Sequence, residues 1–293
     1  MAVFHMKPLI AIALLAALGC EKTADSPTPD PTPSPTNDGV QLVSLGEGAQ
    51  RVLRYHLRKG THTTTEIAMT MDLDVARAMK MPTVVMVMDI AVEDVLANGS
   101  ARVATRITES RLVERPGTTM DVATLSPLTQ KLTGLGYAFT LSPDGTLSEG
   151  RITGAAGGDV QAQLGQMTRA IEQVAMRLPP VPVGVGATWS AKKTVQQNGL
   201  AVTTVTTTRL TAIEGEQLTF TSQTTLSAPN QQLVQQGLTM DVKDVGGGGT
   251  GKGTVDLTTM AMRGELTSEF RGTITAAGQP PTAMNVMMQL TLK

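Results

Sequence analysis

Apolar side chains that recur at every second position are the feature that most constrains how this chain folds. One such stretch carries Ile67, Met69, Met71 and Leu73, and another carries Val84, Met86, Met88, Ile90 and Val92. Successive side chains of a β-strand point to opposite faces, so a period of two predicts strands with one apolar face. The many threonines of the chain also favour strands. We therefore predict a mainly β fold.

Glycine-containing turns separate these stretches and predict how the strands connect. Asn98-Gly99 and Asn198-Gly199 supply the positive φ angles of tight hairpins, and Pro143-Asp144-Gly145 and Glu214-Gly215 mark two further turns. Hairpins join antiparallel neighbours. We expect an antiparallel curved sheet or open barrel of about eleven to thirteen strands.

Two segments have helical spacing instead. Six apolar residues follow one another at intervals of four and three, namely Val160, Leu164, Met167, Ile171, Val174 and Leu178. With Asp159 as N-cap and Pro179-Pro180 as its stop, this pattern predicts a long amphipathic helix at residues 159–178, packed inside the sheet. A shorter helix is expected at residues 121–132.

The strands and the long helix form one predicted β-rich domain, residues 40–293. Its two sides, 40–157 and 181–293, each contain a pair of long strands and a shorter hairpin, joined by the helix at 159–178. This similarity is consistent with an internal repeat of two β-meanders or with an ordinary antiparallel meander.

The N-terminal residues predict export. An apolar run of about eleven residues, 8–18, is too short for a bilayer core of about 30 Å and fits a signal peptide at 1–19. Ala17-Leu18-Gly19-Cys20 closes the run and resembles the lipobox of bacterial lipoproteins, although Ala17 stands where leucine is commoner. The resemblance implies a diacylglycerol on the Cys20 thiol, cleavage before it and acylation of the new amino terminus. The alternative is an ordinary signal cleaved further on, with Cys20 incidental.

A tether is predicted at residues 20–39, between the lipidated cysteine and the body. Proline alternates there with serine, threonine and aspartate, and no large aliphatic side chain is present. Such a segment buries too little surface to offset its ordering entropy and acts as a disordered, semi-rigid spacer. By resemblance to Gram-negative sorting, Glu21 after the cysteine implies the outer membrane.

The body resembles an uncharacterised family of β-rich bacterial envelope lipoproteins. The resemblance rests on the LP…V-G-V-G…W junction at 178–189 and on the G-Y-x-F-x-L-x-x-D-G hairpin at 136–145. It implies an all-β body wrapped around a helix, and it brings no activity with it.

Few residues have a pattern that predicts chemistry. GGGGTGKGT at 246–254 lacks the hydroxyl residue of a P-loop and is expected to be a flexible hairpin loop. Thioether pairs at alternate positions suit Cu(I), and the candidates are Met69, Met71, Met86 and Met88. Core or cavity lining is the favoured interpretation of these methionines. No other metal site, no cofactor and no catalytic group is predicted.

Charge and composition exclude one class of partner. Lysine and arginine number 24 against 25 acidic residues, and aromatic residues make up 2% of the chain. Nucleic-acid binding, which needs clustered cations and stacking rings, is not expected.

We expect a non-enzymatic structural or interaction module of the cell envelope that contacts the membrane through Cys20. The alternative is a carrier of a lipid or another apolar ligand in a cavity lined by Met, Leu and Val.

Overall fold

The computed structural model describes residues 39–75, 77–154, 176–197, 200–235, 238–276 and 278–293. These residues contain one helix, α2 (Val122–Gln130), and sixteen strands. The strands are β1 (Val40–Ser44), β2 (Glu47–Arg51), β3 (His62–Val75), β4 (Arg77–Lys80), β5 (Thr83–Val95), β6 (Ala101–Val113), β7 (Gly136–Leu141), β8 (Leu147–Thr153), β9 (Val183–Val185), β10 (Thr188–Gln197), β11 (Leu200–Glu214), β12 (Gln217–Ser227), β13 (Gln231–Gln235), β14 (Leu238–Asp256), β15 (Met262–Ala276) and β16 (Thr282–Leu292).

One sheet of fourteen strands contains almost all of them, in the order β1-β10-β11-β12-β14-β15-β16-β3-β5-β6-β7-β8. β13 pairs with β14, β4 pairs with β3, and β2 and β9 form a separate pair. All pairings are antiparallel, and the strands on either side of each of the four predicted turns pair with each other. The predicted mainly β, antiparallel fold is confirmed. The strand number is higher than expected because β1, β2, β4, β9 and β13 are too short to show alternation.

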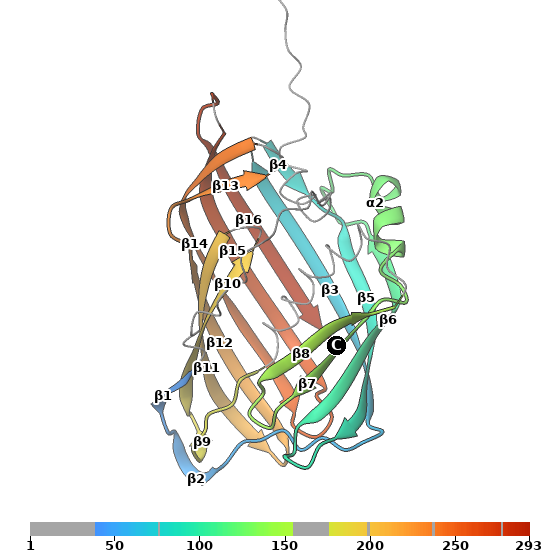
Figure 1. The fold of residues 1–293 in the computed structure, drawn as a ribbon, viewed down its shortest axis with the longest axis vertical. Coiled ribbons are helices and arrows are strands. Elements are labelled where there is room, and N and C mark those ends of the chain that lie inside the picture. The colour runs from blue at the N-terminus through green and yellow to red at the C-terminus, as the bar shows by residue number, and fades with distance from the viewer. Residues whose placement is uncertain (1–38, 76, 155–175, 198–199, 236–237, 277) are drawn as a thin grey trace, which may run out of the picture.

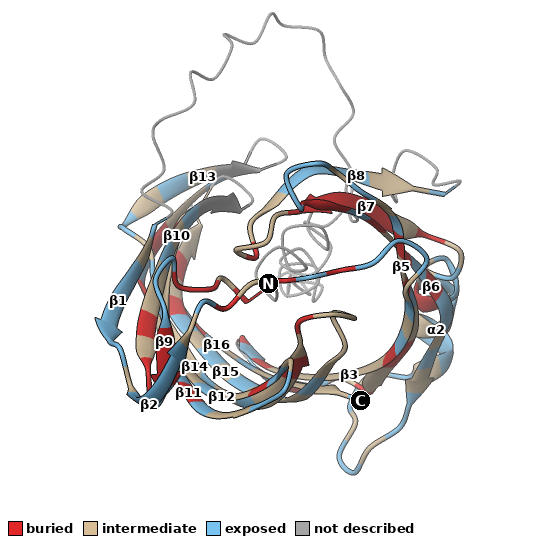
Figure 2. Cartoon of the chain, turned by 90° about the horizontal axis from the view of Figure 1, so that it is seen from below, coloured by how far each residue is buried: buried red, intermediate tan, exposed pale blue. Residues whose placement is uncertain are grey.

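The sheet curves around a central space without closing. Figure 1 shows long strands tilted side by side, with β7 and β8 in front and β15 and β16 behind. In the view along the strands, the sheet forms an incomplete ring whose gap lies between β8 and β13 (Figure 2). Within the described residues, β1 and β8 pair with nothing on their outer sides. The two sides predicted from the sequence meet where β16 pairs with β3.

A segment at residues 52–61 crosses one end of this ring, which we call the lower end (Figure 2). The Tyr55 N–H donates to the Pro143 carbonyl and the His56 N–H to the Leu257 carbonyl, both at 2.8 Å. These bonds attach the segment to two hairpins on different sides of the sheet. We call residues 52–61 the closing segment.

Alternation within the closing segment fills the lower end with apolar side chains. Leu53, Tyr55 and Leu57 are 0%, 5% and 8% exposed and belong to the larger core cluster. Trp189 joins this cluster from β10, and its Nε1 donates to the Arg177 carbonyl at 2.8 Å. A smaller cluster at the other end of the sheet contains Val75, Val242, Val245, Ile274 and Met284. The core therefore occupies the two ends of the sheet.

The helix predictions have different outcomes. α2 confirms the short helix, and its N-cap Asp121 accepts a hydrogen bond from the Ala123 N–H at 3.0 Å. Residues 155–175 of the long predicted helix lie outside the described residues. Its expected last turn is wrong, because residues 176–178 are not helical. Leu178 instead donates its N–H to the Asp144 carbonyl and is 1% exposed in the larger cluster. The described residues contain no helix long and apolar enough to span a bilayer.

The glycine-rich segment at 246–254 corrects a second prediction. It lies inside β14 and pairs with β12 on one side and β15 on the other, so it is not a hairpin loop. The strands approach so closely that a Cβ at Gly249 would lie 2.5 Å from the Thr267 carbonyl oxygen. Glycine here permits close strand packing, whereas the sequence pattern was typical of a turn.

Candidate functional site: the concave face

The residues that face the inside of the sheet follow from the core clusters. Leu218 of β12 and Val255 of β14 lie in the larger cluster, and Val75 of β3 and Met284 of β16 lie in the smaller one. Side chains of a strand return to the same face every two residues. Counting in twos from these buried residues gives the inward-facing positions along the middle of each strand.

Sulfur-containing and aliphatic side chains cover one side of this concave face. The register pairs Met71 with Met288, Met69 with Leu290 and Ile67 with Met86, and the two members of each pair share a face. We call this set the methionine wall; its members are Ile67, Met69, Met71, Met86, Met88, Met288 and Leu290. Met287, the neighbour of Met288, points to the outer face and is 43% exposed.

Hydroxyl side chains cover the facing side. Counting in twos from Leu210 and Leu218 brings Thr206, Thr208, Ser222 and Thr224 to the inner face of β11 and β12. Thr206 and Thr224 lie opposite each other, with their Oγ1 atoms 3.0 Å apart in a hydrogen bond. We call these four residues the hydroxyl wall.

Glycines separate the two walls. The inward positions of β14 between Val255 and the bulge near residue 245 are Gly247, Gly249, Gly251 and Gly253. β14 therefore adds no side chains to this part of the concave face. Its neighbour β15 adds Leu266, Ser268 and Phe270, so the face has an apolar side and a hydroxyl side, with a bare strand next to the hydroxyl side.

The middle of the concave face is less buried than its ends. Met69, Met71, Met288 and Leu290 are intermediate in exposure, whereas the cluster residues at either end are buried. An apolar wall that the described residues only half cover retains surface for a further apolar group.

The copper candidates lie together on this wall. Met69 and Met71 are successive inward residues of β3, and Met86 and Met88 are successive inward residues of β5. Met86 lies opposite Ile67 and Met69 lies opposite Leu290, so these methionines are part of a mainly apolar lining. In the part of the chain that the structure describes, no group of three or more His, Cys, Asp or Glu residues is placed to hold a metal ion. Cys20 lies outside the described residues.

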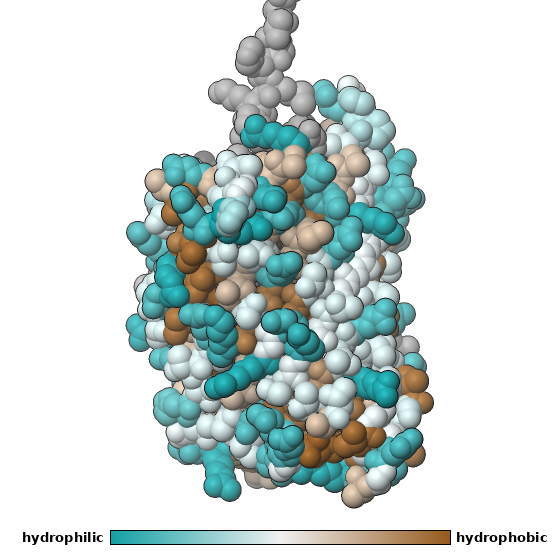
Figure 3. All heavy atoms as spheres, turned by 180° about the vertical axis from the view of Figure 1, so that it is seen from behind, coloured by the Kyte–Doolittle hydropathy of each residue, from teal (hydrophilic) through white to brown (hydrophobic). Residues whose placement is uncertain are grey.

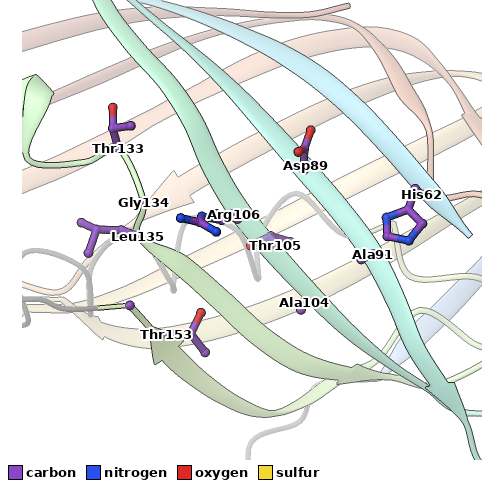
Figure 4. Close-up of a pocket in the computed structure, with 11 residues that line it drawn as sticks. His62, Asp89, Ala91, Ala104, Thr105, Arg106, Thr133, Gly134, Leu135 and Thr153 are labelled. Carbon is purple, nitrogen blue, oxygen red and sulfur yellow. The ribbon is translucent and has the colours of Figure 1, made fainter. Parts of the chain in front are cut away.

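A second hollow, of about 690 Å³, lies on the outer face of β5 and β6 (Figure 4). Its polar side chains His62, Asp89 and Arg106 are exposed. Asp89 lies directly opposite Arg106 and accepts a hydrogen bond from the Thr64 hydroxyl at 2.9 Å. The opposite charges offset each other locally, and the open shape selects no ligand class.

Two titrating groups with shifted pKa values, Tyr55 and Glu66, support the fold. Burial raises the pKa of Tyr55 well above its usual range, and its hydroxyl contacts the Met176 carbonyl at 3.4 Å. A hydrogen bond from Lys293, and then one from Arg111, lowers the pKa of Glu66. The backbones of Glu66 and Lys293 also exchange two hydrogen bonds where β3 meets β16. Neither of these two shifts indicates an acid–base pair on the concave face.

Sequence patterns predicted the methionines of β3 and β5 as candidates but missed the partners that complete the face. Residues 201–228 carry threonine or serine on both strand faces, so alternation could not reveal which hydroxyls point inward. The position of Met288 depends on the pairing of β16 with β3, residues more than 200 positions apart. No local signal indicates that pairing.

Comparison with known proteins adds one match. Residues 161–260 are similar to a protein family described as a family of unknown function, DUF6263. The match covers about a third of the chain, from β9 to the end of β14 together with residues that precede β9. No curated protein matches the chain.

Proposed function

We propose that this protein is a lipid-anchored envelope protein whose body binds an apolar ligand, such as a lipid acyl chain, on the concave face. The half-buried methionine wall is the observation that carries the ligand-binding part. The lipobox-like Ala17-Leu18-Gly19-Cys20 carries the anchoring part.

The positions of the two core clusters favour a ligand bound between them over an interior that is fully packed with side chains. Both clusters lie at the ends of the sheet, while the inward side chains Met69, Met71, Met288 and Leu290 between them are intermediate in exposure. Thioethers are flexible and polarizable, so they adapt to chains of different length and unsaturation. A ligand of this kind gains free energy mainly through removal of apolar surface from water.

The hydroxyl wall suits the polar part of such a ligand. Its Thr206 and Thr224 side chains already bond to each other. Each hydroxyl also has further acceptor capacity, since an oxygen carries two lone pairs. The proposed ligand is therefore an amphiphile that lies along the face with its chain on the methionine wall. The body itself would perform no chemical step.

Binding is tested with the purified full chain and the fluorescent fatty acid cis-parinaric acid. Met288→Gln changes an inward residue, and Met287→Gln is its matched control on the outer face. We expect the first variant to weaken parinaric acid binding about fivefold or more, from the loss of about 1 kcal/mol of apolar contact. The control should bind like the unaltered chain. If the unaltered chain and both variants bind parinaric acid equally, or if none of them binds it, the ligand proposal is wrong and the interaction module is favoured.

Native mass spectrometry of protein extracted from membranes gives an independent measurement. A co-purifying amphiphile supports the carrier, whereas an unliganded mass with a bound protein supports the module. For the anchor, Cys20→Ala should move the protein from the membrane fraction to the soluble fraction. Retention of that variant in the membrane would show that the lipobox interpretation is wrong.

A further inference from the structure

Exposed aliphatic side chains gather at one corner of the lower end. Val43 is 66% exposed, Val52 47%, Leu45 44% and Val185 44%. Figure 3 shows hydrophobic residues at the lower right of the rear face, the corner that holds β1, β2 and β9 at the lower left of Figure 1. Single exposed aliphatic residues need no explanation, but a contiguous group on a small area does.

Hydrogen bonds place the segments that carry these residues beside one another. The Gly184 N–H donates to the Leu45 carbonyl at 2.9 Å, and β9 pairs with β2 through Glu47 opposite Val185. The Arg54 guanidinium, in the closing segment beside Val52, donates to the Pro179 carbonyl at 2.9 Å. These contacts bring β1, β9 and the closing segment to one surface. We call it the corner patch; its residues are Val43, Leu45, Val52, Val181 and Val185.

Charges around the corner patch largely offset one another. Arg51 forms an ion pair with Glu216 at 3.2 Å, and the Arg54 guanidinium is a further cation at this corner. Glu47 is an exposed acid within β2. A highly charged partner surface is therefore not favoured, and apolar contact is the main interaction that this patch offers.

The chain leads directly from the patch to the predicted anchor. β1 begins at Val40, and nineteen residues, 21–39, separate it from Cys20. A proline-rich linker rises about 3.1 Å per residue, so the patch stays within about 60 Å of a lipid inserted at Cys20. Such a link raises the effective concentration of the patch at the bilayer to about the millimolar range. A contact between the patch and the bilayer that is too weak to form without the anchor can then form in a substantial fraction of the molecules.

We propose that the corner patch docks onto the bilayer interface to which Cys20 is anchored, so that the lower end of the sheet faces the membrane. This inference rests on the proposed lipid anchor. Apolar side chains enter the boundary between headgroups and acyl chains, and the balanced local charge makes the contact insensitive to salt. The opposite end, with α2 and β13, then faces away from the membrane.

The test uses the full lipidated chain in phosphatidylcholine vesicles with brominated acyl chains, which quench a nearby fluorophore. Cys20 is the sole cysteine, so acylation leaves an introduced cysteine as the one reactive thiol. Val52→Cys and Val113→Cys form a matched pair, because the two valines are 47% and 43% exposed at opposite ends of the sheet. Each is labelled with bimane.

We expect bromolipid quenching at position 52 to be at least three times that at position 113, at both low and high salt. The double variant Val43→Ser/Leu45→Ser, which changes exposed side chains, should reduce that ratio towards one. Equal quenching at both positions, or none at position 52, overturns the docking proposal while the anchor stands. Failure of the chain to remain on the vesicles overturns the anchor and the docking together.

Discussion

Removal of the Leu53 side chain should destabilise the whole body, although Leu53 lies in a segment without regular secondary structure. Leu53 is fully buried in the larger core cluster, between hairpins that the closing segment joins. Leu53→Ala removes three carbon atoms, at about 0.8 kcal/mol each, and leaves a cavity that adds to this loss. We expect the free energy of unfolding to fall by about 3 kcal/mol.

Urea denaturation of the purified chain measures this change. Trp189 is the sole tryptophan and is 1% exposed in the same cluster, so its fluorescence reports unfolding of the lower end. With a denaturant slope of about 3 kcal/mol/M, the midpoint should fall by about 1 M. Val52→Ala is the matched control, because Val52 is the adjacent residue and is half-exposed. Its effect should stay within about 0.5 kcal/mol.

A small effect of Leu53→Ala would refute this reasoning. If the two variants differed by less than about 1 kcal/mol, burial at the lower end would not stabilise the sheet. The closing segment would then be a loop resting on the body instead of part of its core.

Two further changes test other parts of the fold. Burial alone would raise the pKa of Asp256, but the hydrogen bonds that it accepts from Thr258 and Thr259 together outweigh this effect and lower the pKa from the ordinary value of 3.8. Asp256→Ala should therefore cost about 1 kcal/mol in urea denaturation at neutral pH, and the difference should shrink as the pH falls through the lowered pKa; a constant difference down to pH 2 would contradict this. Gly249→Val should lower stability by about 2 kcal/mol in thermal unfolding, because its Cβ would overlap the Thr267 carbonyl, while the exposed neighbour Thr250→Val should change little. Equal melting temperatures for the two valine variants would show that β14 does not need glycine.

Local patterns predicted the strands and turns of this chain well. The alternation in 84–92 and the Asn98-Gly99 turn both depend on neighbouring residues, and they predicted β5 and its hairpin with β6. The N-cap of α2 at Asp121 is equally local. Such features are determined within a few residues, so a single sequence suffices for them.

The features that the sequence did not predict depend on distant partners. The glycines at 246–253 were interpreted as a turn because glycine usually marks one, yet β12 and β15 both pair with them. The closing segment alternates like a strand at 53–57, but it bonds to two hairpins instead of joining the large sheet. Of the residues on the concave face, the sequence predicted only the methionines. Which threonines and serines of β11 and β12 point inward depends on the register between these two strands.

The pairing of β16 with β3 has a consequence for the order in which the protein forms. Glu66 and Lys293 meet across this seam although 227 positions separate them in the sequence. Contacts of such long range require a large loop to close before they contribute stability, and they slow folding. If the chain is exported as we propose, β3 would therefore keep one unpaired edge until β16 has crossed the membrane. That edge is the place where a holding chaperone, or a misfolded neighbour, would compete with the native strand.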